Sequence, residues 1–238
     1  MYGVTYPMTY HSGPVAKSVA QRIFEISLAV GRVPKMYKLA AQVPIPKPDS
    51  DNEFRPISLL PVHDKHLERI VHNRLMHKFG HLLHPNLFGF RKGRGCQDGI
   101  TAVSQAASET IFRRISTARV NPNSNKCVAV FVDLEKAFEM ANATSILYEL
   151  TRLGVKGKML GWLRDYLRDR KGYVTVDGKK SHVTPFENGT PQGSILSPLL
   201  FNVLMHALLS RKWINVYVYS YADDLVILAS GKNPLKDA

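Results

Sequence analysis

Two adjacent aspartates near the end of the chain are the residues best suited to chemistry. Asp223 and Asp224 close the tetrapeptide Tyr-Ala-Asp-Asp at residues 221–224, and apolar, β-branched and aromatic residues flank it on both sides. This pattern predicts a β-hairpin with both carboxylates at its turn. Neighbouring carboxylates repel each other, and a bound divalent cation would relieve that repulsion. The alternative is an ordinary polar turn, because Asp is common in turns that bind no metal.

A third carboxylate, Asp133, follows the apolar residues 127–132. That short continuous run predicts a buried central strand, with Asp133 at its carboxyl end. Asp133 lies 223 − 133 = 90 residues before Asp223, which is enough chain for the two strands to become neighbours. Carboxylates from two strand ends would suit two Mg²⁺ ions about 3.5–4 Å apart, an arrangement that promotes in-line displacement at phosphorus. Asp133 could instead cap the helix that follows it.

Composition points to a polyanionic partner. The 238 residues include 32 Lys and Arg against 19 Asp and Glu, a net charge of +13. Nucleic acid is the first candidate and an anionic membrane surface the second. No apolar run approaches the roughly 20 residues of a membrane span. Cys96 and Cys127 have neither metal-site spacing nor the density of a disulfide framework, so we expect the reducing interior of a cell.

Helical periodicity and turn residues predict the elements that would position these groups. Five apolar residues recur at helical spacing between residues 14 and 30, and Gly31 would end that helix. Prolines at positions 44, 46 and 48 indicate an edge strand that runs into an extended loop. Asp177-Gly178 predicts a hairpin within residues 172–188. Further helices are predicted over residues 62–83, 97–119, 143–153, 157–169 and 194–209.

Six segments, taken in order, carry a resemblance to a known family. They are Val-Pro-Ile-Pro-Lys at 43–47, Phe-Arg-Pro-Ile-Ser-Leu-Leu at 54–60, Phe-Gly-Phe-Arg at 88–91, Phe-Val-Asp-Leu-Glu-Lys-Ala-Phe at 131–138, the Gly-Thr-Pro-Gln-Gly-Ser box at 189–202, and Tyr-Ala-Asp-Asp at 221–224. The chain resembles the reverse transcriptases of non-LTR (LINE-type) retrotransposons. The resemblance covers most of the chain from about residue 32 onward.

The resemblance implies an α+β fold, the polymerase fingers-palm fold of the reverse transcriptase type, with an antiparallel palm sheet, packed helices and no thumb. Residues 1–126 would form a fingers-like region, with an irregular stretch at 1–13. Residues 127–238 would form a partial palm, truncated after the Tyr-Ala-Asp-Asp hairpin. On this view the chain is a C-terminally truncated fragment, and we expect the isolated 238 residues to have weak activity or none.

The resemblance also implies roles for individual residues. Asp133 and Asp223 would be the main metal ligands and catalytic residues, with Asp224 alongside and the Leu134 carbonyl assisting. Lys47 and Arg55 would grip the triphosphate, which suits a point charge and a bidentate guanidinium. The remaining nucleotide contacts would be Phe138 under the sugar and Gln192 and Gly193 against the base pair, and the template contacts would be Arg91, Lys92 and Arg94.

Each of these roles has an alternative that the residues alone leave open. The two loop cations could be merely solvated, Phe138 could be a core aromatic, and Gln192 could be a polar residue at a helix start. The family pattern usually has Asp after Ala-Phe, and this chain has Glu139 there. The fine positioning of the site residues around Glu139 could therefore differ from that of the family.

The function implied by the resemblance is RNA-directed DNA polymerisation. Deoxynucleotides would be added to a primer 3′-hydroxyl with two Mg²⁺ ions, or Mn²⁺ as an alternative. The partners would be an RNA template, a DNA primer or target and deoxynucleoside triphosphates, with no membrane and no small-molecule organic cofactor. We expect an intracellular protein, located in the nucleus or the cytoplasm, whose site of action is the nucleus. The alternatives are a catalytically idle remnant that binds nucleic acid, and a group II intron or retron-type reverse transcriptase.

Overall fold

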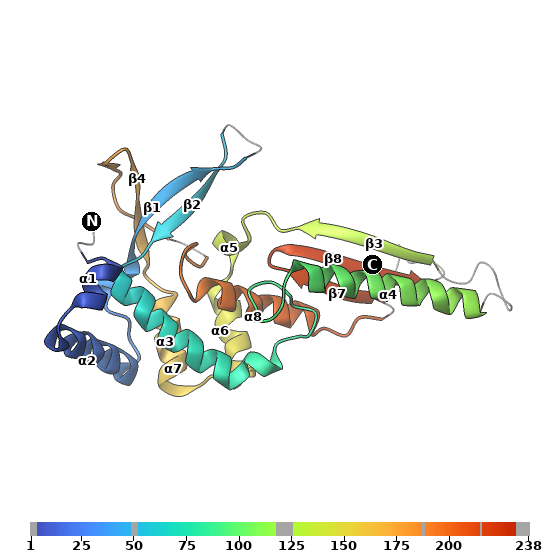
Figure 1. The fold of residues 1–238 in the computed structure, drawn as a ribbon, viewed down its shortest axis with the longest axis horizontal. Helices are drawn as coiled ribbons and strands as arrows, with labels where there is room; N and C mark the ends of the chain where they lie inside the picture. The colour runs from blue at the N-terminus through green and yellow to red at the C-terminus, as the bar shows by residue number, and fades with distance from the viewer. Residues whose placement is uncertain (1–3, 49–51, 118–125, 187–188, 215, 232–238) are drawn as a thin grey trace. The chain divides into compact units, whose positions relative to one another are not determined.

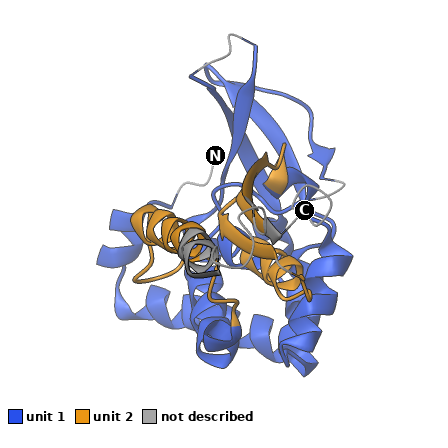
Figure 2. Cartoon of the chain, turned by 90° about the vertical axis from the view of Figure 1, so that its right-hand side faces the viewer, with its two compact units in different colours: residues 1–82, 138–200 blue, residues 83–137, 201–238 orange. Residues whose placement is uncertain are grey.

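The computed structural model describes residues 4–48, 52–117, 126–186, 189–214 and 216–231. The chain divides into two compact units (Figure 2). Unit 1 comprises Met1–Leu82 and Phe138–Leu200, and unit 2 comprises Leu83–Ala137 and Phe201–Ala238. The division into fingers and palm regions at residue 126 remains a prediction.

Unit 1 combines a small sheet with several helices. Its elements are α1 (Tyr6–His11), α2 (Pro14–Val30), η1 (Lys35–Lys38), β1 (Leu39–Pro46), β2 (Phe54–Leu59), α3 (Val62–Phe79), η2 (Gly80–Leu82), α5 (Ala137–Met140), α6 (Ala143–Arg152), α7 (Gly157–Tyr166), β4 (Lys171–Val176), β5 (Lys179–Lys180), β6 (Thr184–Pro185) and the start of α8 (Ser197–Leu209). Most predicted helices are confirmed. The irregular lead-in is wrong for α1, where the Thr5 hydroxyl caps the helix by accepting from the Met8 N–H.

The sheet of unit 1 corrects the prediction made from the prolines. The strand order is β2-β1-β4-β5, so β1 lies between two strands and is not an edge. β4 pairs in parallel only with Leu39–Gln42, whereas Pro44 and Pro46 lie farther along, where β2 is the partner (Figure 1). Proline lacks an N–H, so it fits the part of β1 that is paired on one side only.

The helices of unit 1 bury a different face of α2 from the one that periodicity suggested. Its five periodic apolar residues are 41–76% exposed: Val15, Val19, Ile23, Ile26 and Val30. The buried residue is Ser27, whose hydroxyl accepts from Trp162 Nε1 of α7 at 2.9 Å. Gly31 ends the helix in the left-handed conformation, as predicted.

Other local patterns are confirmed. The helix predicted over residues 62–83 ends at Phe79, and Leu67, Val71, Leu75 and Phe79 of its apolar face are buried, whereas Leu82 is 49% exposed. Asp177 and Gly178 both have positive φ, 49° and 78°, and they join β4 to β5. Two positive φ angles define the turn type that Asp-Gly favours in tight hairpins.

Unit 2 places one helix against a three-stranded antiparallel sheet. The strands β3 (Lys126–Asp133), β8 (Asp224–Gly231) and β7 (Val216–Tyr221) lie in the order β3-β8-β7, and α4 (Cys96–Thr117) packs on them (Figure 1). The core contains Phe88, Tyr219 and Leu228, with partly buried residues of α4 packed against them. The main part of α8 also belongs to this unit.

β3 is not the buried central strand that its apolar run predicted. Among the described residues it pairs only with β8, and its Phe131 side chain is 75% exposed. A continuous apolar run fits a strand at either place in a sheet, so the run alone could not decide its position. Among the described helices, none is long and apolar enough to cross a membrane.

Candidate catalytic site

The Tyr-Ala-Asp-Asp segment forms a two-residue hairpin turn. Tyr221 pairs with Asp224, so Ala222 and Asp223 make the turn and Asp224 begins β8. The prediction of a hairpin is confirmed, but only one of the two aspartates occupies the turn itself. Ala222 has φ 54°, a left-handed conformation that is uncommon for residues other than glycine. The surrounding structure must therefore hold this turn in place.

Asp133 lies directly opposite Asp224. The antiparallel ladder of β3 and β8 pairs these two residues, as it pairs Phe131 with Val226. Directly paired residues of an antiparallel ladder project from the same face of the sheet. Both aspartates are exposed. The structure thus brings two of the three predicted carboxylates together within unit 2.

The two carboxylates lie at the side of a largely apolar groove of about 570 Å³. Ile100 and Val103 of α4 line one wall, and Phe131 of β3 lines the other. Carboxylates facing an open groove are accessible to a polar ligand, which a buried structural aspartate would not be.

The donor set suits a hard divalent cation. Asp133 and Asp224 face each other, and Asp223 is the neighbouring residue, so carboxylate oxygens from two strand ends are available. Mg²⁺ binds through one or two carboxylates and keeps its other positions for water and phosphate. Within the described ranges no three His, Cys, Asp or Glu side chains are close enough to hold an ion. The ligand roles, including that of the Leu134 carbonyl, remain predictions.

The predicted template contacts lie in the loop after Leu87. The Arg91 guanidinium donates to the carbonyls of His84 and Leu87 at 2.9 and 3.3 Å. Arg94 donates to the Pro85 carbonyl and lies 5.5 Å over the Phe88 ring. These two arginines therefore shape their own loop, whereas Lys92 is exposed.

The predicted phosphate-binding residues lie on the β1–β2 hairpin of unit 1. Arg55 of β2 pairs with Ile45, and the Lys47 N–H bonds to the Glu53 carbonyl two residues farther along. This register puts Lys47 and Arg55 on the same face. Lys47 Nζ also lies 2.6 Å from the Glu53 carboxylate, and both groups are partly exposed. An exposed pair of this kind is weak, so an incoming phosphate could compete for the lysine.

The Gly-Thr-Pro-Gln-Gly box is fixed by its two glycines. A Cβ at Gly189 would lie 2.5 Å from the Glu139 carbonyl oxygen, and one at Gly193 would lie 2.6 Å from that of Ser58. The Ser58 N–H donates to the Gln192 carbonyl at 2.6 Å, which joins the box to β2. Only glycine permits both approaches.

Glu139 and Phe138 of α5 both contact the box. Gln192 Nε2 donates to Glu139 Oε1 at 3.4 Å. Glu139 therefore reaches the box from α5. Phe138 precedes it and is half-buried, and its carbonyl accepts from the Thr190 N–H at 2.9 Å.

A buried polar network behind the box was missed in the sequence. The Glu68 carboxylate of α3 accepts from the hydroxyls of Tyr166 and Ser194, both at 2.9 Å, and from the Ile195 N–H at 2.6 Å. The hydroxyl oxygens of Tyr166 and Ser194 also lie 2.6 Å apart, so either hydroxyl can donate to the other in place of Glu68. Only the placement of Glu68 on the apolar face of α3, one residue after Leu67, hinted at a buried role.

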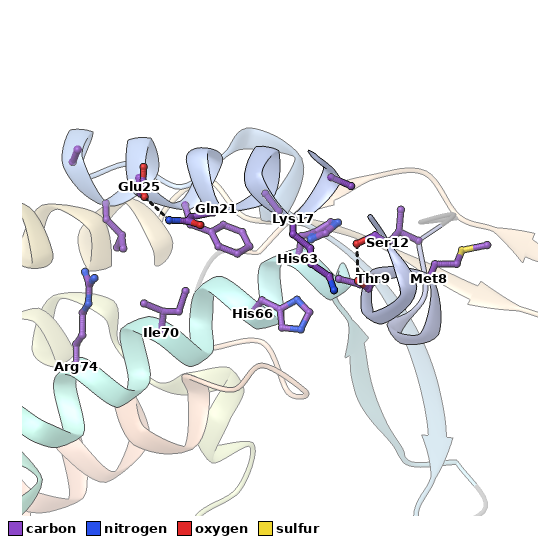
Figure 3. Close-up of a pocket in the computed structure, with 16 residues that line it drawn as sticks. Met8, Thr9, Ser12, Lys17, Gln21, Glu25, His63, His66, Ile70 and Arg74 are labelled. Carbon is purple, nitrogen blue, oxygen red and sulfur yellow. Dashed lines mark hydrogen bonds between the residues drawn. The ribbon is translucent and has the colours of Figure 1, made fainter. Parts of the chain in front are cut away.

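A second hollow of unit 1 lies away from the predicted site. A groove of about 980 Å³ opens between α1, α2 and α3, and Figure 3 shows Ile70 and the imidazoles of His63 and His66 along it. None of the residues predicted to bind metal, nucleotide or nucleic acid lines this groove.

Comparison with known proteins identifies the family. Residues 45–238 match the family described as reverse transcriptase (RNA-dependent DNA polymerase). The chain belongs to this family. The RNA-directed DNA polymerase from mobile element jockey of Drosophila melanogaster is 30% identical over 225 residues. The probable RNA-directed DNA polymerase from transposon BS, of the same organism, is 30% identical over 223 residues.

The resemblance to non-LTR elements is confirmed by these relatives. The matches cover 90% and 87% of this reverse transcriptase chain, but the chain spans only 23% of the length of each relative. Apo telomerase from Candida tropicalis, truncated from its C-terminal domain, superposes with a TM-score of 0.60 at 13% identity. That superposition covers 94% of this chain and 50% of the telomerase chain. The expected α+β fold of the reverse transcriptase type is confirmed. Enzymes of this family generally use divalent metal ions.

Proposed function

We propose that this chain is the polymerase domain of a non-LTR retrotransposon protein, which copies RNA by adding deoxynucleotides to a primer 3′-hydroxyl. The observation that carries the proposal is the pairing of Asp133 with Asp224 across β3 and β8, beside Asp223 in the turn. The net charge of +13 suits a nucleic-acid partner. An RNA template, a DNA primer and deoxynucleoside triphosphates are the proposed substrates.

The aspartates of unit 2 would hold two Mg²⁺ ions. Those ions would lower the pKa of the attacking hydroxyl and stabilise the transition state at phosphorus. Asp133 and Asp223 would supply the main oxygen ligands, with Asp224 and the Leu134 carbonyl beside them. The role of the protein is to keep these oxygens at fixed strand ends, so that the primer oxygen and the phosphate meet in line.

Unit 1 would supply the nucleotide contacts. Lys47 and Arg55 share one face of the β1–β2 hairpin, and their charges would bind the triphosphate. Phe138 would contact the sugar, and its position in α5 next to the Gly189–Thr190 backbone would limit its movement. Gln192 and Gly193 would lie against the incoming base pair.

RNA-templated primer extension tests this proposal. The protein that contains this chain should extend a DNA primer on an RNA template with Mg²⁺ and deoxynucleotides, and Asp223→Asn should reduce the rate by roughly a thousandfold or more. Binding of the primer–template should weaken with salt in both proteins, because phosphate contacts release counterions. Salt-sensitive binding without extension by the unmodified protein would instead favour the idle remnant.

The cellular location follows as part of the same proposal. A polymerase that extends a chromosomal primer must act where the target DNA lies, so we propose that the protein works inside the cell, in the nucleus. Fractionation of cells that express the element would test this placement, and its exclusion from nuclei would contradict it.

A further inference from the structure

The residues before the Arg91 loop run beside β7 like an additional strand. The Ser220 N–H donates to the Asn86 carbonyl at 3.0 Å, and the Phe88 N–H donates to the Ser220 carbonyl at 2.9 Å. The side-chain amide of Asn86 donates to the Val218 carbonyl at 3.0 Å. Ser220 is 2% exposed and lies two residues before Ala222. These bonds therefore fix the path by which β7 enters the catalytic turn.

Gly89 meets the turn itself. A Cβ at this position would collide with the backbone nitrogen of Ala222 and lie 3.0 Å from its Cα. The backbone of Gly89 is thus packed directly against the residue that carries the unfavourable left-handed conformation. Such a conformation persists only where neighbouring structure enforces it.

One buried side chain holds Gly89 in this position. Asn202 of α8 is 1% exposed, and its Nδ2 donates to the Gly89 carbonyl at 3.0 Å. A buried amide nitrogen is costly to leave without an acceptor, so the contact constrains both groups. All of these residues lie within unit 2.

We propose that Asn202 is a positioning residue for polymerisation, acting through the Gly89 backbone to hold the Ala222–Asp223 turn. The inference rests on the proposed function, and it gives the Phe-Gly-Phe-Arg segment a task besides contact with the template. Displacing a catalytic group by about 1 Å can slow a reaction on the order of a hundredfold. We call this contact between Asn202 and the Gly89 carbonyl the brace. The brace sets kcat through the position of the Asp223 carboxylate, while the nucleotide contacts of unit 1 are unaffected.

Matched asparagine substitutions test this role. Asn202→Asp keeps the shape of the side chain but removes the donor. Asn142→Asp makes the same change at the N-cap of α6, where the Oδ1 atom accepts from the Ser145 N–H and an aspartate oxygen can do the same. The expected result is a fall of about tenfold to a hundredfold in kcat for Asn202→Asp, with the nucleotide KM little changed. Asn142→Asp should keep the kcat of the unmodified protein. Equal kcat for both variants, with both folded, would overturn the proposal.

A double-mutant comparison separates positioning from general destabilisation. Ala222→Gly removes the steric cost of the left-handed turn, so adding Asn202→Asp to it should lower kcat less than in the Ala222 background. Independent, multiplicative effects would contradict a brace that acts on this turn. Asn202→Ser, whose shorter neutral side chain does not reach the Gly89 carbonyl, provides the same test if Asn202→Asp does not fold.

Amide hydrogen exchange tests the role of Asn202 without relying on polymerase activity. Amides of residues 216–224 should exchange faster in Asn202→Asp than in Asn142→Asp, whether or not the protein extends primers. Absence of extension by the unmodified protein would count against the polymerase. Unchanged exchange at the turn would count against the brace alone.

Discussion

Replacing Glu68 with leucine should destabilise unit 1 strongly. The carboxylate is fully buried and accepts hydrogen bonds from Tyr166, Ser194 and Ile195. Leucine would fill part of the space with a side chain that accepts none of them. The donors would then remain buried without an acceptor, which costs more than a hydrogen bond gains.

The size of the effect follows from which donors can find other partners. Tyr166 can still donate to the Ser194 oxygen, because these groups lie 2.6 Å apart. The Ser194 hydroxyl hydrogen and the Ile195 N–H would remain unpaired. At about 1–3 kcal/mol for each, Glu68→Leu should lower the free energy of unfolding by roughly 2–6 kcal/mol.

Glu68→Gln is the matched variant. The glutamine oxygen can accept from Ser194 and Ile195, while its Nε2 donates to the Tyr166 oxygen and Tyr166 donates to Ser194. The Tyr166, Ser194 and Ile195 donors then all keep acceptors and one Nε2 hydrogen is left over, so the change should cost less than Glu68→Leu, about 1–2 kcal/mol. Glu25→Leu, at an exposed position of α2 in the same unit, should leave the unfolding midpoint nearly unchanged.

Urea unfolding followed by tryptophan fluorescence would measure these differences. The chain has two tryptophans, and Trp162 is fully buried in unit 1 and stacked on Tyr166. A Trp213→Phe background would leave Trp162 as the reporter of unit 1. Equal unfolding free energies for Glu68→Leu and Glu68→Gln would refute the argument, because only the leucine variant lacks acceptors.

Three further outcomes follow from unit 1. Burial first, and then the Glu68 charge, raise the pKa of Asp64 from 3.8 to about 8, so the folded state retains a proton that the unfolded state releases. Unfolding free energy should therefore fall as pH rises from about 4 to about 8, by up to about 1.4 kcal/mol per pH unit, and Asp64→Asn should flatten this dependence in urea titrations. Gly193→Ala should destabilise the unit by more than Gly157→Ala in thermal unfolding, because both have positive φ but only Gly193 is pressed against a carbonyl oxygen. Arg55→Lys should raise the nucleotide KM by about tenfold with little change in kcat, because lysine keeps the charge and loses the bidentate fork; an unchanged KM would remove Arg55 from the phosphate site.

Local signals in the sequence predicted local structure well. Asp177-Gly178 gave the correct hairpin, Gly31 gave the correct helix end, and the Tyr-Ala-Asp-Asp segment gave the correct turn. In each case a few neighbouring residues determine the backbone conformation, so no distant contact is needed to predict it. The family resemblance supplied the antiparallel sheet, which periodicity alone could not specify.

Positions within the sheets were predicted less well. The prolines of β1 indicated an edge strand, but β1 lies between β2 and β4. β4 pairs with the first half of β1, and the prolines lie in the other half. The apolar residues of β3 indicated a central strand, yet Phe131 is exposed. A strand's place in a sheet depends on which other segments pair with it, and this information is not contained in the strand itself.

The groups that position the site were the hardest to predict. Glu68 and Ser194 are 126 residues apart in sequence, and Asn202 reaches Gly89 across 113 residues. Nothing local marks a glutamate or an asparagine as a partner for a distant loop. The exposed apolar residues of α2 show the complementary problem, since periodicity predicted the helix but not which of its faces would be buried.

Binding of Mn²⁺ tests most directly whether Asp133 and its partners form the metal site. Electron paramagnetic resonance would count Mn²⁺ bound to the protein with an RNA template, a chain-terminated primer and the incoming nucleotide. Glu135→Gln is the matched control, because Glu135 lies two residues away with a side chain that is 87% exposed. We predict that Asp133→Asn weakens Mn²⁺ binding by about tenfold or more while Glu135→Gln leaves it unchanged. Equal Mn²⁺ affinity in the two variants would contradict the assignment of the metal site.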